Sequence, residues 1–248
     1  MIAIVTGATG DIGEEFVKSL LSETDQVWAV GRSENKLTSL KEKYGDKIVP
    51  VRVDLSDRDD IFSFCEKIES EKPEIGYLVN NAGVAKMKPV SDFTLEEISD
   101  MLDINDKAAT LICRACIPYM VKGSYILNVA SASAFQPNPY IALYSASKAY
   151  LLSFTRSLNV ENENITCTAV CPGWVDTKML SKQRDGKDIR YPGMTPASKV
   201  VEVALKDCHK GKDVSVCSFY FRYMRFLSKV TPHSIAMKMW VKAIRQYI

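Results

Sequence analysis

The chain has 248 residues, of which 46% are hydrophobic and 25% charged, and its formal net charge is +2. These values are typical of one large soluble globular domain that buries its core without disulfide staples. A charge-free apolar run of about 18 residues is missing, so we expect no membrane-spanning helix.

Cysteine usage and the first residues bear on the cellular compartment. The seven cysteines are an odd number without a disulfide framework, which is typical of a reducing compartment. The chain opens on an apolar strand without a charged leader, so we expect no signal peptide and a cytoplasmic location. Cys113 and Cys116 have CxxC spacing within a helical pattern, so we interpret them as a buried helix face and predict no metal site.

Short apolar segments alternate with longer amphipathic ones along most of the chain. The segments rich in Val and Ile predict strands at 1–5, 26–30, 47–53, 75–79, 124–129 and 165–170. The segments between them predict helices at 11–22, 34–44, 57–71, 94–121 and 140–162, with Ser56 and Asp59 as one helix-start signal. This alternation predicts a single-domain, doubly wound α/β Rossmann fold over residues 1–248, with a mainly parallel sheet of about seven strands and helices on both faces.

The alternation of short apolar and longer amphipathic segments ends after residue 178. The polar stretch 178–196, bracketed by Gly and Pro, predicts a loop or lid. A helix at 196–208 and a strand at 213–217 follow. The basic, aromatic tail, 219–248, is predicted to form two helices separated by Pro232.

The first strand runs directly into "TGATGDIG", residues 6–13. Gly7 allows a tight turn, Gly10 a close approach of backbone to a pyrophosphate, and Gly13 close packing of helix on strand. The N–H groups of the following helix would face the anion. We interpret Asp11 as a spacer that caps those N–H groups and turns away from the phosphate. An ordinary strand-to-helix turn is the alternative.

Residues after the next strands suit the remainder of a dinucleotide. Arg32 stands where such sites often carry a carboxylate. Its guanidinium suits a ribose 2′-phosphate. The alternative interpretation is that Arg32 is a solvated side chain in a turn. Asp54 would accept a hydrogen bond from an adenine amino group, or it would begin the cap of the next helix. The small residues of "NNAG", 80–83, predict a loop that lies flat against adenine or ribose. A plain turn is the alternative.

Three polar residues follow the fifth predicted strand in a pattern that suits proton transfer. Ser131 ends that strand, and Tyr144 and Lys148 share a helix face four residues apart. An ammonium beside a phenol favours phenolate and lowers the phenol pKa from its usual value near 10. Ser131 would hydrogen-bond a carbonyl or alcohol oxygen. After the sixth strand, Pro172 and Gly173 turn the backbone sharply, and Thr177 suits a carboxamide such as that of nicotinamide.

Together these residues resemble the short-chain dehydrogenase/reductase family, in its classical branch, over roughly residues 1–178. The resemblance rests on "NNAG", Ser131, the Tyr144–Lys148 pair and "PGWVDT", all in family order. It implies that Tyr144 is the general acid in reduction, that Ser131 clamps the substrate oxygen, and that Lys148 lowers the Tyr pKa and holds the nicotinamide ribose. It also implies that Asn105 anchors a proton-relay water.

The sequence departs from the family pattern in the glycine loop. Classical members usually read TGxxxGxG, whereas this chain reads TGxxGxxG, the spacing of the extended branch. A second base that selects NADP is missing because Gly10 stands there, so the NADP preference depends on Arg32, and NAD is the alternative cofactor. The expected cofactor-binding residues are Gly7, Thr9, Gly10, Asp11, Ile12, Gly13, Arg32, Ser33, Asp54, Leu55, Asn81, Ala82, Gly83, Tyr144, Lys148, Pro172, Gly173, Val175 and Thr177.

The substrate is less defined by the sequence. Phe135, Trp174 and Met179 near the expected pocket suit an apolar ketone, a steroid or an acyl chain. The cationic residues of the lid favour an anionic substrate such as an acyl thioester; the alternative is that they form a solvated surface. The lid carries five cationic residues, Lys178, Lys182, Arg184, Lys187 and Arg190, and two acidic residues, Asp185 and Asp188.

The basic tail leaves three interpretations open. The last acidic residue of the chain is Asp213, so the tail contributes only positive charge. We favour packing, as a subunit contact or as a wall of the substrate site, over contact with an anionic membrane surface. No nucleic-acid recognition motif accompanies the basic residues, and we expect no nucleic acid partner.

We therefore predict an NADP(H)-dependent oxidoreductase that interconverts a ketone and a secondary alcohol, working as a homodimer or homotetramer. The alternative is a nucleotide-sensing binding protein on the same fold with little or no turnover.

Overall fold

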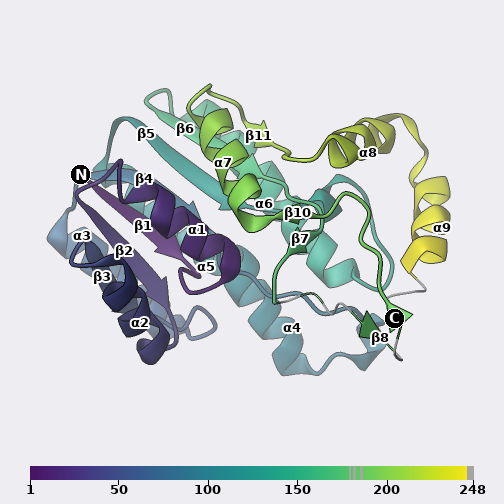
Figure 1. The fold of residues 1–248 in the computed structure, drawn as a ribbon, viewed down its shortest axis with the longest axis horizontal. Coiled ribbons are helices and arrows are strands. Elements are labelled where there is room, and N and C mark those ends of the chain that lie inside the picture. Colours follow the sequence, from purple (N-terminus) through teal and green to yellow (C-terminus); the bar gives the residue numbers. More distant parts are fainter. Residues whose placement is uncertain (179, 181–182, 185–186, 245–248) are drawn as a thin grey trace.

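The computed structural model describes residues 1–178, 180, 183–184 and 187–244 (Figure 1). Seven strands pair in parallel in the order β11-β6-β5-β4-β1-β2-β3, which confirms the predicted parallel Rossmann sheet. These strands are β1 (Ile2–Thr6), β2 (Gln26–Gly31), β3 (Ile48–Arg52), β4 (Ile75–Asn80), β5 (Met120–Val129), β6 (Ile165–Val170) and β11 (Val214–Ser215). Two-residue strands form small separate pairs: β7 (Val175–Asp176) with β10 (Thr195–Pro196), and β8 (Gln183–Arg184) with β9 (Lys187–Asp188).

Helices cover both faces of the sheet (Figure 1). They are α1 (Asp11–Leu20), α2 (Glu34–Tyr44), α3 (Arg58–Glu71), α4 (Leu95–Leu102), α5 (Ala108–Cys116), α6 (Ala142–Glu161), α7 (Ala197–Cys208), α8 (Phe219–Val230) and α9 (His233–Ile244). Four short helical turns join them: η1 (Val90–Asp92), the π-helical η2 (Asp103–Lys107), η3 (Ile117–Tyr119) and η4 (Ala132–Phe135). No helix in the described part of the chain is long and apolar enough to cross a bilayer.

The first strand shows why these segments are apolar without alternation. Successive side chains of a strand point to opposite faces of the sheet. Ala3 and Val5 pack in the core beneath α1, α2 and α7, while Ile4 packs in the second core beneath α3 and α5. Because both faces are covered by helices, every central residue of β1 is buried, as expected for a parallel sheet.

The predicted helix over 94–121 is wrong in its length. The structure breaks this segment into α4, the π-helical η2, α5 and η3, and β5 already begins at Met120. Pro118 lies in η3, where a proline without an N–H and with a fixed φ interrupts an α-helix. Cys113 and Cys116 are buried on α5, as expected for a helix face.

The predicted start signal of α3 is also wrong. Asp57, not Ser56, caps the helix, and its carboxylate accepts from the N–H groups of Asp59 and Asp60 at 2.8 and 3.1 Å. A carboxylate is a strong N-cap because it satisfies free N–H groups and meets the positive end of the helix dipole. Ser56 is engaged elsewhere, in the site described below.

Candidate active site

The glycine loop forms a tight cradle between β1 and α1. Gly7 has a φ of +60°, which favours glycine, and a Cβ on Gly13 would lie only 2.1 Å from the carbonyl oxygen of Gly7. A Cβ on Gly10 would meet nothing closer than 3.4 Å, so this face of the loop is open. An open backbone face at a helix N-terminus is the environment that a pyrophosphate group binds.

Asp11 does not cap α1, contrary to the prediction. The helix begins after Gly10 without a side-chain cap, and the Asp11 carboxylate instead accepts from the backbone N–H of Lys178 at 2.8 Å. Asp11 therefore ties the glycine loop to the start of the predicted lid, across 167 positions of sequence. Among the described residues, no side-chain oxygen accepts from the N–H groups at the start of α1, which leaves them available to an anion.

The residues expected at the adenosine end follow β2 and β3, next to the glycine loop. Asp54 does not cap α3, and its carboxylate accepts from the N–H and the hydroxyl of Ser56 at 3.0 and 2.7 Å. These bonds lower the pKa of Asp54, with a smaller contribution from the charge of Arg32. Arg32 is exposed, Ser33 precedes α2, and Leu55 is buried.

The "NNAG" loop is held by the glycine loop. Asn81 donates from Nδ2 to the carbonyl oxygens of Thr6 and Gly7 at 3.2 and 3.1 Å, and the Thr6 hydroxyl accepts from the N–H groups of Asn81 and Ala82. The Asn81 side chain therefore shapes the cradle. A Cβ on Gly83 would lie 3.1 Å from the Lys148 Nζ, so the loop reaches the polar residues of α6.

Ser131, Tyr144 and Lys148 lie together beyond the carboxyl end of β5. Ser131 follows β5, while the other two lie one turn apart on α6, with the Lys148 Nζ 5.8 Å from the centroid of the Tyr144 ring. A hydrogen bond links the Ser131 and Tyr144 side chains. Lys148 is 3% exposed, and its Nζ donates to the Val129 carbonyl at 2.8 Å.

The predicted lowering of the Tyr144 pKa is wrong in this structure. Burial raises the pKa of Tyr144, and the hydrogen bond with Ser131 only partly opposes that shift. Burial also lowers the pKa of Lys148 to about 8, because a buried ammonium loses its hydration. The Tyr144 phenol therefore holds its proton more firmly than it would in water. The Lys148 ammonium holds its proton less firmly than it would in water.

Asn105 lies at the site, and both of its amide hydrogens are used. It is 1% exposed, and its Nδ2 donates to the Val84 carbonyl and to the Ser147 hydroxyl at 3.0 and 3.1 Å. Its Oδ1 accepts from the Val84 N–H at 2.8 Å. Both amide hydrogens are used, while Oδ1 can accept a second hydrogen bond. The anchoring of a relay water by Asn105 stays a prediction. Asn105 joins the loop after β4 to α6.

Asp106, the neighbour of Asn105 in η2, was not predicted from the sequence. Its Oδ1 is buried without a hydrogen-bond partner among the described residues. Burial raises the pKa of Asp106 to about 6, and the charge of Lys148 opposes this shift. In turn, the Asp106 carboxylate raises the pKa of Lys148 against the effect of burial. Spacing alone gave no sign of this pair, because the two residues lie on different elements.

We expect Asp106→Asn to move the alkaline limb of the kcat/KM profile to lower pH. Without the carboxylate, the pKa of Lys148 falls below about 8, so the ammonium loses its proton at a lower pH. The measurement is the pH dependence of kcat/KM between about pH 6 and 10. Asp103→Asn is the matched control, because Asp103 in the same turn pairs with the exposed Lys107. An alkaline limb that stays in place would contradict the electrostatic link.

The segment after β6 forms another wall of the site. The Pro172 carbonyl accepts from the N–H of Ala132 at 2.8 Å, which joins this segment to η4. A Cβ on Gly173 would overlap the ring of Phe221, so α8 packs directly on the turn. Val175 is buried in β7, and Thr177 borders a cavity of about 460 Å³ beside Asp11. The remaining expected residues, Thr9 and Ile12, lie in the glycine loop and the first turn of α1.

The tail helices α8 and α9 pack beside η4 and the turn after β6. The Arg225 guanidinium lies 5.6 Å from the centroid of Phe135, in η4. Trp240 on α9 donates from Nε1 to the Pro139 carbonyl at 2.8 Å, beside Tyr140, whose φ of +68° is left-handed. These contacts place the tail as a wall of the candidate site. Of the other residues expected there, Trp174 packs on Tyr191, whereas Met179, Lys182 and Asp185 lie outside the described residues.

Comparison with known proteins agrees with this geometry. Residues 1–188 match the family model described as short chain dehydrogenase. The very-long-chain 3-oxoacyl-CoA reductase of Anas platyrhynchos is 30% identical, with 98% of this chain and 80% of the relative covered. The NADP-dependent 3-hydroxy acid dehydrogenase YdfG of Escherichia coli K12 is 31% identical, with 75% of this chain and 79% of the relative covered.

A solved structure is similar as well. The closed form of a serine dehydrogenase complexed with NADP+ is 31% identical and superposes with a TM-score of 0.64, over 71% of this chain and 73% of that chain. The family match covers most of this chain, and the parallel seven-stranded sheet is the one predicted from the sequence. The chain belongs to the short chain dehydrogenase family of oxidoreductases.

Proposed function

We propose that this protein interconverts a ketone and a secondary alcohol with NADP(H) as the cofactor. The observation that supports it best is the clustering of Ser131, Tyr144 and Lys148 beside the glycine loop, at one edge of the sheet. A polar cluster beyond the carboxyl ends of parallel strands is where ligands bind in such folds. The NADP-bound serine dehydrogenase and the NADP-dependent YdfG support the choice of cofactor.

The residues present fit a dinucleotide. The open face of Gly10 and the uncapped start of α1 would hold the pyrophosphate, and Arg32 would pair with the 2′-phosphate. Gly83 leaves room for the Lys148 Nζ, whose donors would hold the nicotinamide ribose. When bound, the cofactor supplies or accepts the hydride.

The chain's own residues would handle the proton. In the direction of reduction, Tyr144 donates its phenolic proton to the substrate oxygen as that oxygen gains charge, and the phenolate remains. Ser131 holds the same oxygen by a hydrogen bond. Lys148 lies over the ring of Tyr144 and stabilises the phenolate, which offsets part of the cost of its burial. In the direction of oxidation, the phenolate takes the proton back from the alcohol.

For the substrate, we propose an apolar 3-oxoacyl or 3-hydroxyacyl compound. The two enzyme relatives act, by their names, on a 3-oxoacyl-CoA and on 3-hydroxy acids. The aromatic rings of Phe135 and Trp174 lie near the site and suit an acyl chain. Lys178 and Arg190 of the lid suit the anionic part of such a substrate.

The test is NADPH oxidation, followed at the absorbance of the reduced nicotinamide, against 3-oxoacyl thioesters, 3-oxo esters and steroid ketones. We expect the 3-oxoacyl compounds to give the highest kcat/KM. NADPH binding without turnover on any ketone would favour a nucleotide-sensing protein instead. We also propose a reducing compartment such as the cytoplasm, supported by seven free thiols, and an assembly of two or four chains.

We expect Arg32→Ala to weaken NADPH binding about 10- to 100-fold while leaving NADH binding nearly unchanged, because only NADPH carries the 2′-phosphate. Fluorescence titration with each cofactor measures the two dissociation constants. Lys36→Ala, an exposed cation on the neighbouring helix α2, serves as the control. If the ratio of the two constants stays the same in Arg32→Ala, this residue does not select the cofactor.

A further inference from the structure

The outward face of α8 carries an apolar stripe that the protein leaves exposed. Phe219, Tyr223, Phe226 and Val230 are spaced at i, i+4, i+7 and i+11, which places them on one face of a helix. Their side chains are 83%, 52%, 60% and 61% exposed. Ile235 and Met239 on α9, 51% and 61% exposed, add to this surface. We call these six residues the apolar stripe.

The opposite faces of both helices are attached to the protein. Phe221 packs on Gly173, Arg225 lies over the Phe135 ring, and Trp240 donates to Pro139. The stripe is therefore not the side through which these helices join the core. An exposed apolar helix face of this kind marks an interaction site.

Positive charge flanks the stripe. Arg222 and Lys229 lie roughly a quarter turn from the stripe on α8, and Arg225 lies about a third of a turn from it. Lys238 and Lys242 are exposed on α9. Since no acidic residue follows Asp213 in the sequence, the face formed by α8 and α9 is cationic throughout.

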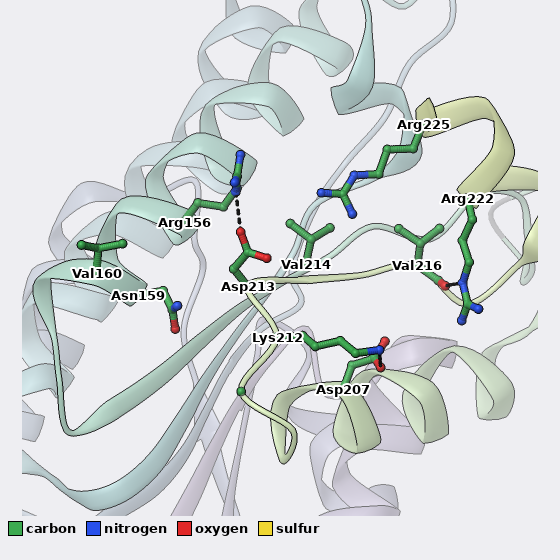
Figure 2. Close-up of a pocket in the computed structure, with 11 residues that line it drawn as sticks. Arg156, Asn159, Val160, Asp207, Lys212, Asp213, Val214, Val216, Arg222 and Arg225 are labelled. Carbon is green, nitrogen blue, oxygen red and sulfur yellow. Dashed lines mark hydrogen bonds and ion pairs between the residues drawn. The ribbon is translucent and has the colours of Figure 1, made fainter. Parts of the chain in front are cut away.

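A cavity of about 640 Å³ opens beside α8, between this helix, α6 and the edge strand β11 (Figure 2). Arg156 pairs with Asp213 at 2.7 Å, and Lys212 pairs with Asp207 at 2.5 Å. Arg222 donates from Nε to the Val216 carbonyl at 2.8 Å. Among the described residues, no carboxylate pairs with Arg222 or Arg225, so the cavity has an excess of positive charge.

We propose that the α8–α9 face docks on the surface of a membrane that contains anionic phospholipid. The apolar stripe lies among the acyl chains near the headgroups, and the cavity beside Arg222 and Arg225 receives a lipid phosphate. An apolar helix face flanked by cations is the pattern of helices that lie in a membrane interface. A second copy of this chain suits the face less well, because a symmetric contact would oppose two cationic surfaces. This proposal does not depend on the reaction proposed above.

Vesicle co-sedimentation with the full chain tests the proposal. We expect binding to phosphatidylcholine vesicles that contain phosphatidylglycerol, and at least about tenfold weaker binding to vesicles of phosphatidylcholine alone. Raising the salt concentration should weaken the binding, because it screens charges at the surface. Phe219→Ser with Phe226→Ser should lower the partition coefficient about tenfold or more, since both exposed rings are lost from the interface.

Matched variants test whether the changes in vesicle binding are specific to the α8–α9 face. Phe62→Ser with Leu95→Ser removes two exposed apolar side chains on α3 and α4 and should bind vesicles like the unmodified chain. Arg222→Glu with Arg225→Glu should remove the preference for anionic vesicles, whereas Lys36→Glu with Lys122→Glu should keep it. Circular dichroism and NADPH binding without vesicles show that each variant is folded.

Three outcomes would overturn the proposal. The first is that the unmodified chain does not bind anionic vesicles. The second is equal binding by the chain that carries Phe219→Ser and Phe226→Ser. The third is a dimer in light scattering that these two changes dissociate while vesicle binding is unaffected, which would assign the stripe to a second copy.

Discussion

Tyr144→Phe is expected to lower kcat for ketone reduction by about 10²- to 10⁴-fold, the contribution typical of a positioned general acid. Phenylalanine keeps the ring and removes the only proton that this position offers to the substrate oxygen. The hydrogen bond with Ser131 is lost as well, but the Lys148 Nζ keeps its bond to the Val129 carbonyl. The cofactor site should therefore survive, and we expect the NADPH dissociation constant to change less than the rate.

The measurement is kcat with a saturating 3-oxoacyl substrate, together with fluorescence titration of NADPH. Tyr150→Phe is the matched control, because Tyr150 lies on the same helix but is 44% exposed and contacts Thr110 with its hydroxyl. If Tyr144→Phe retains most of its activity, the phenol is not the proton donor and the proposed mechanism is wrong.

The second large effect concerns the glycine loop, where two substitutions should behave differently. Gly13→Ala should destabilise the fold by about 3 kcal/mol or more, because the new Cβ would lie 2.1 Å from the Gly7 carbonyl oxygen and 2.8 Å from the Asn81 Nδ2. In a chain of this size, that corresponds to a fall in Tm of roughly 6–12 °C.

Gly10→Ala should leave the fold within about 1 kcal/mol of the unmodified chain, since its Cβ would meet nothing closer than 3.4 Å and its φ of −86° suits any residue. Its methyl group would instead occupy the open face of the cradle, so NADPH binding should weaken about tenfold or more. Thermal unfolding and NADPH titration of both variants separate the two effects. A stable Gly13→Ala chain, or unchanged NADPH binding by Gly10→Ala, would show that the loop is not the close-packed cradle inferred here.

Patterns that act over a few residues were sufficient to predict the architecture. The central strands β1 and β4 are apolar runs without alternation, because both faces of the sheet are covered. The helices between the strands have one apolar face. The glycines at 7, 10 and 13 and the spacing of Tyr144 and Lys148 are local as well. The parallel sheet, the family and the identity of the clustered polar residues follow from such features.

The partners of single side chains depended on the tertiary structure. Asp11 was expected to cap its own helix, yet it binds the backbone of Lys178, 167 positions away. Asn105 was expected at the site, but the sequence did not show that Val84 and Ser147 use both of its amide hydrogens. The pKa of Tyr144 was expected to fall, but burial raises it. Each outcome depends on which groups the fold brings within hydrogen-bond distance and on how much water it removes.

The sequence by itself determined the α/β fold, the family and the residues that gather at the sheet edge, because period, glycine spacing and helix register are properties of neighbouring residues. Only the tertiary structure decided that Asp106 faces Lys148, that Phe221 packs on Gly173, and that the stripe of α8 points away from the core. These facts depend on contacts between elements distant in sequence, and burial and electrostatics act on the pKa values only after those contacts form.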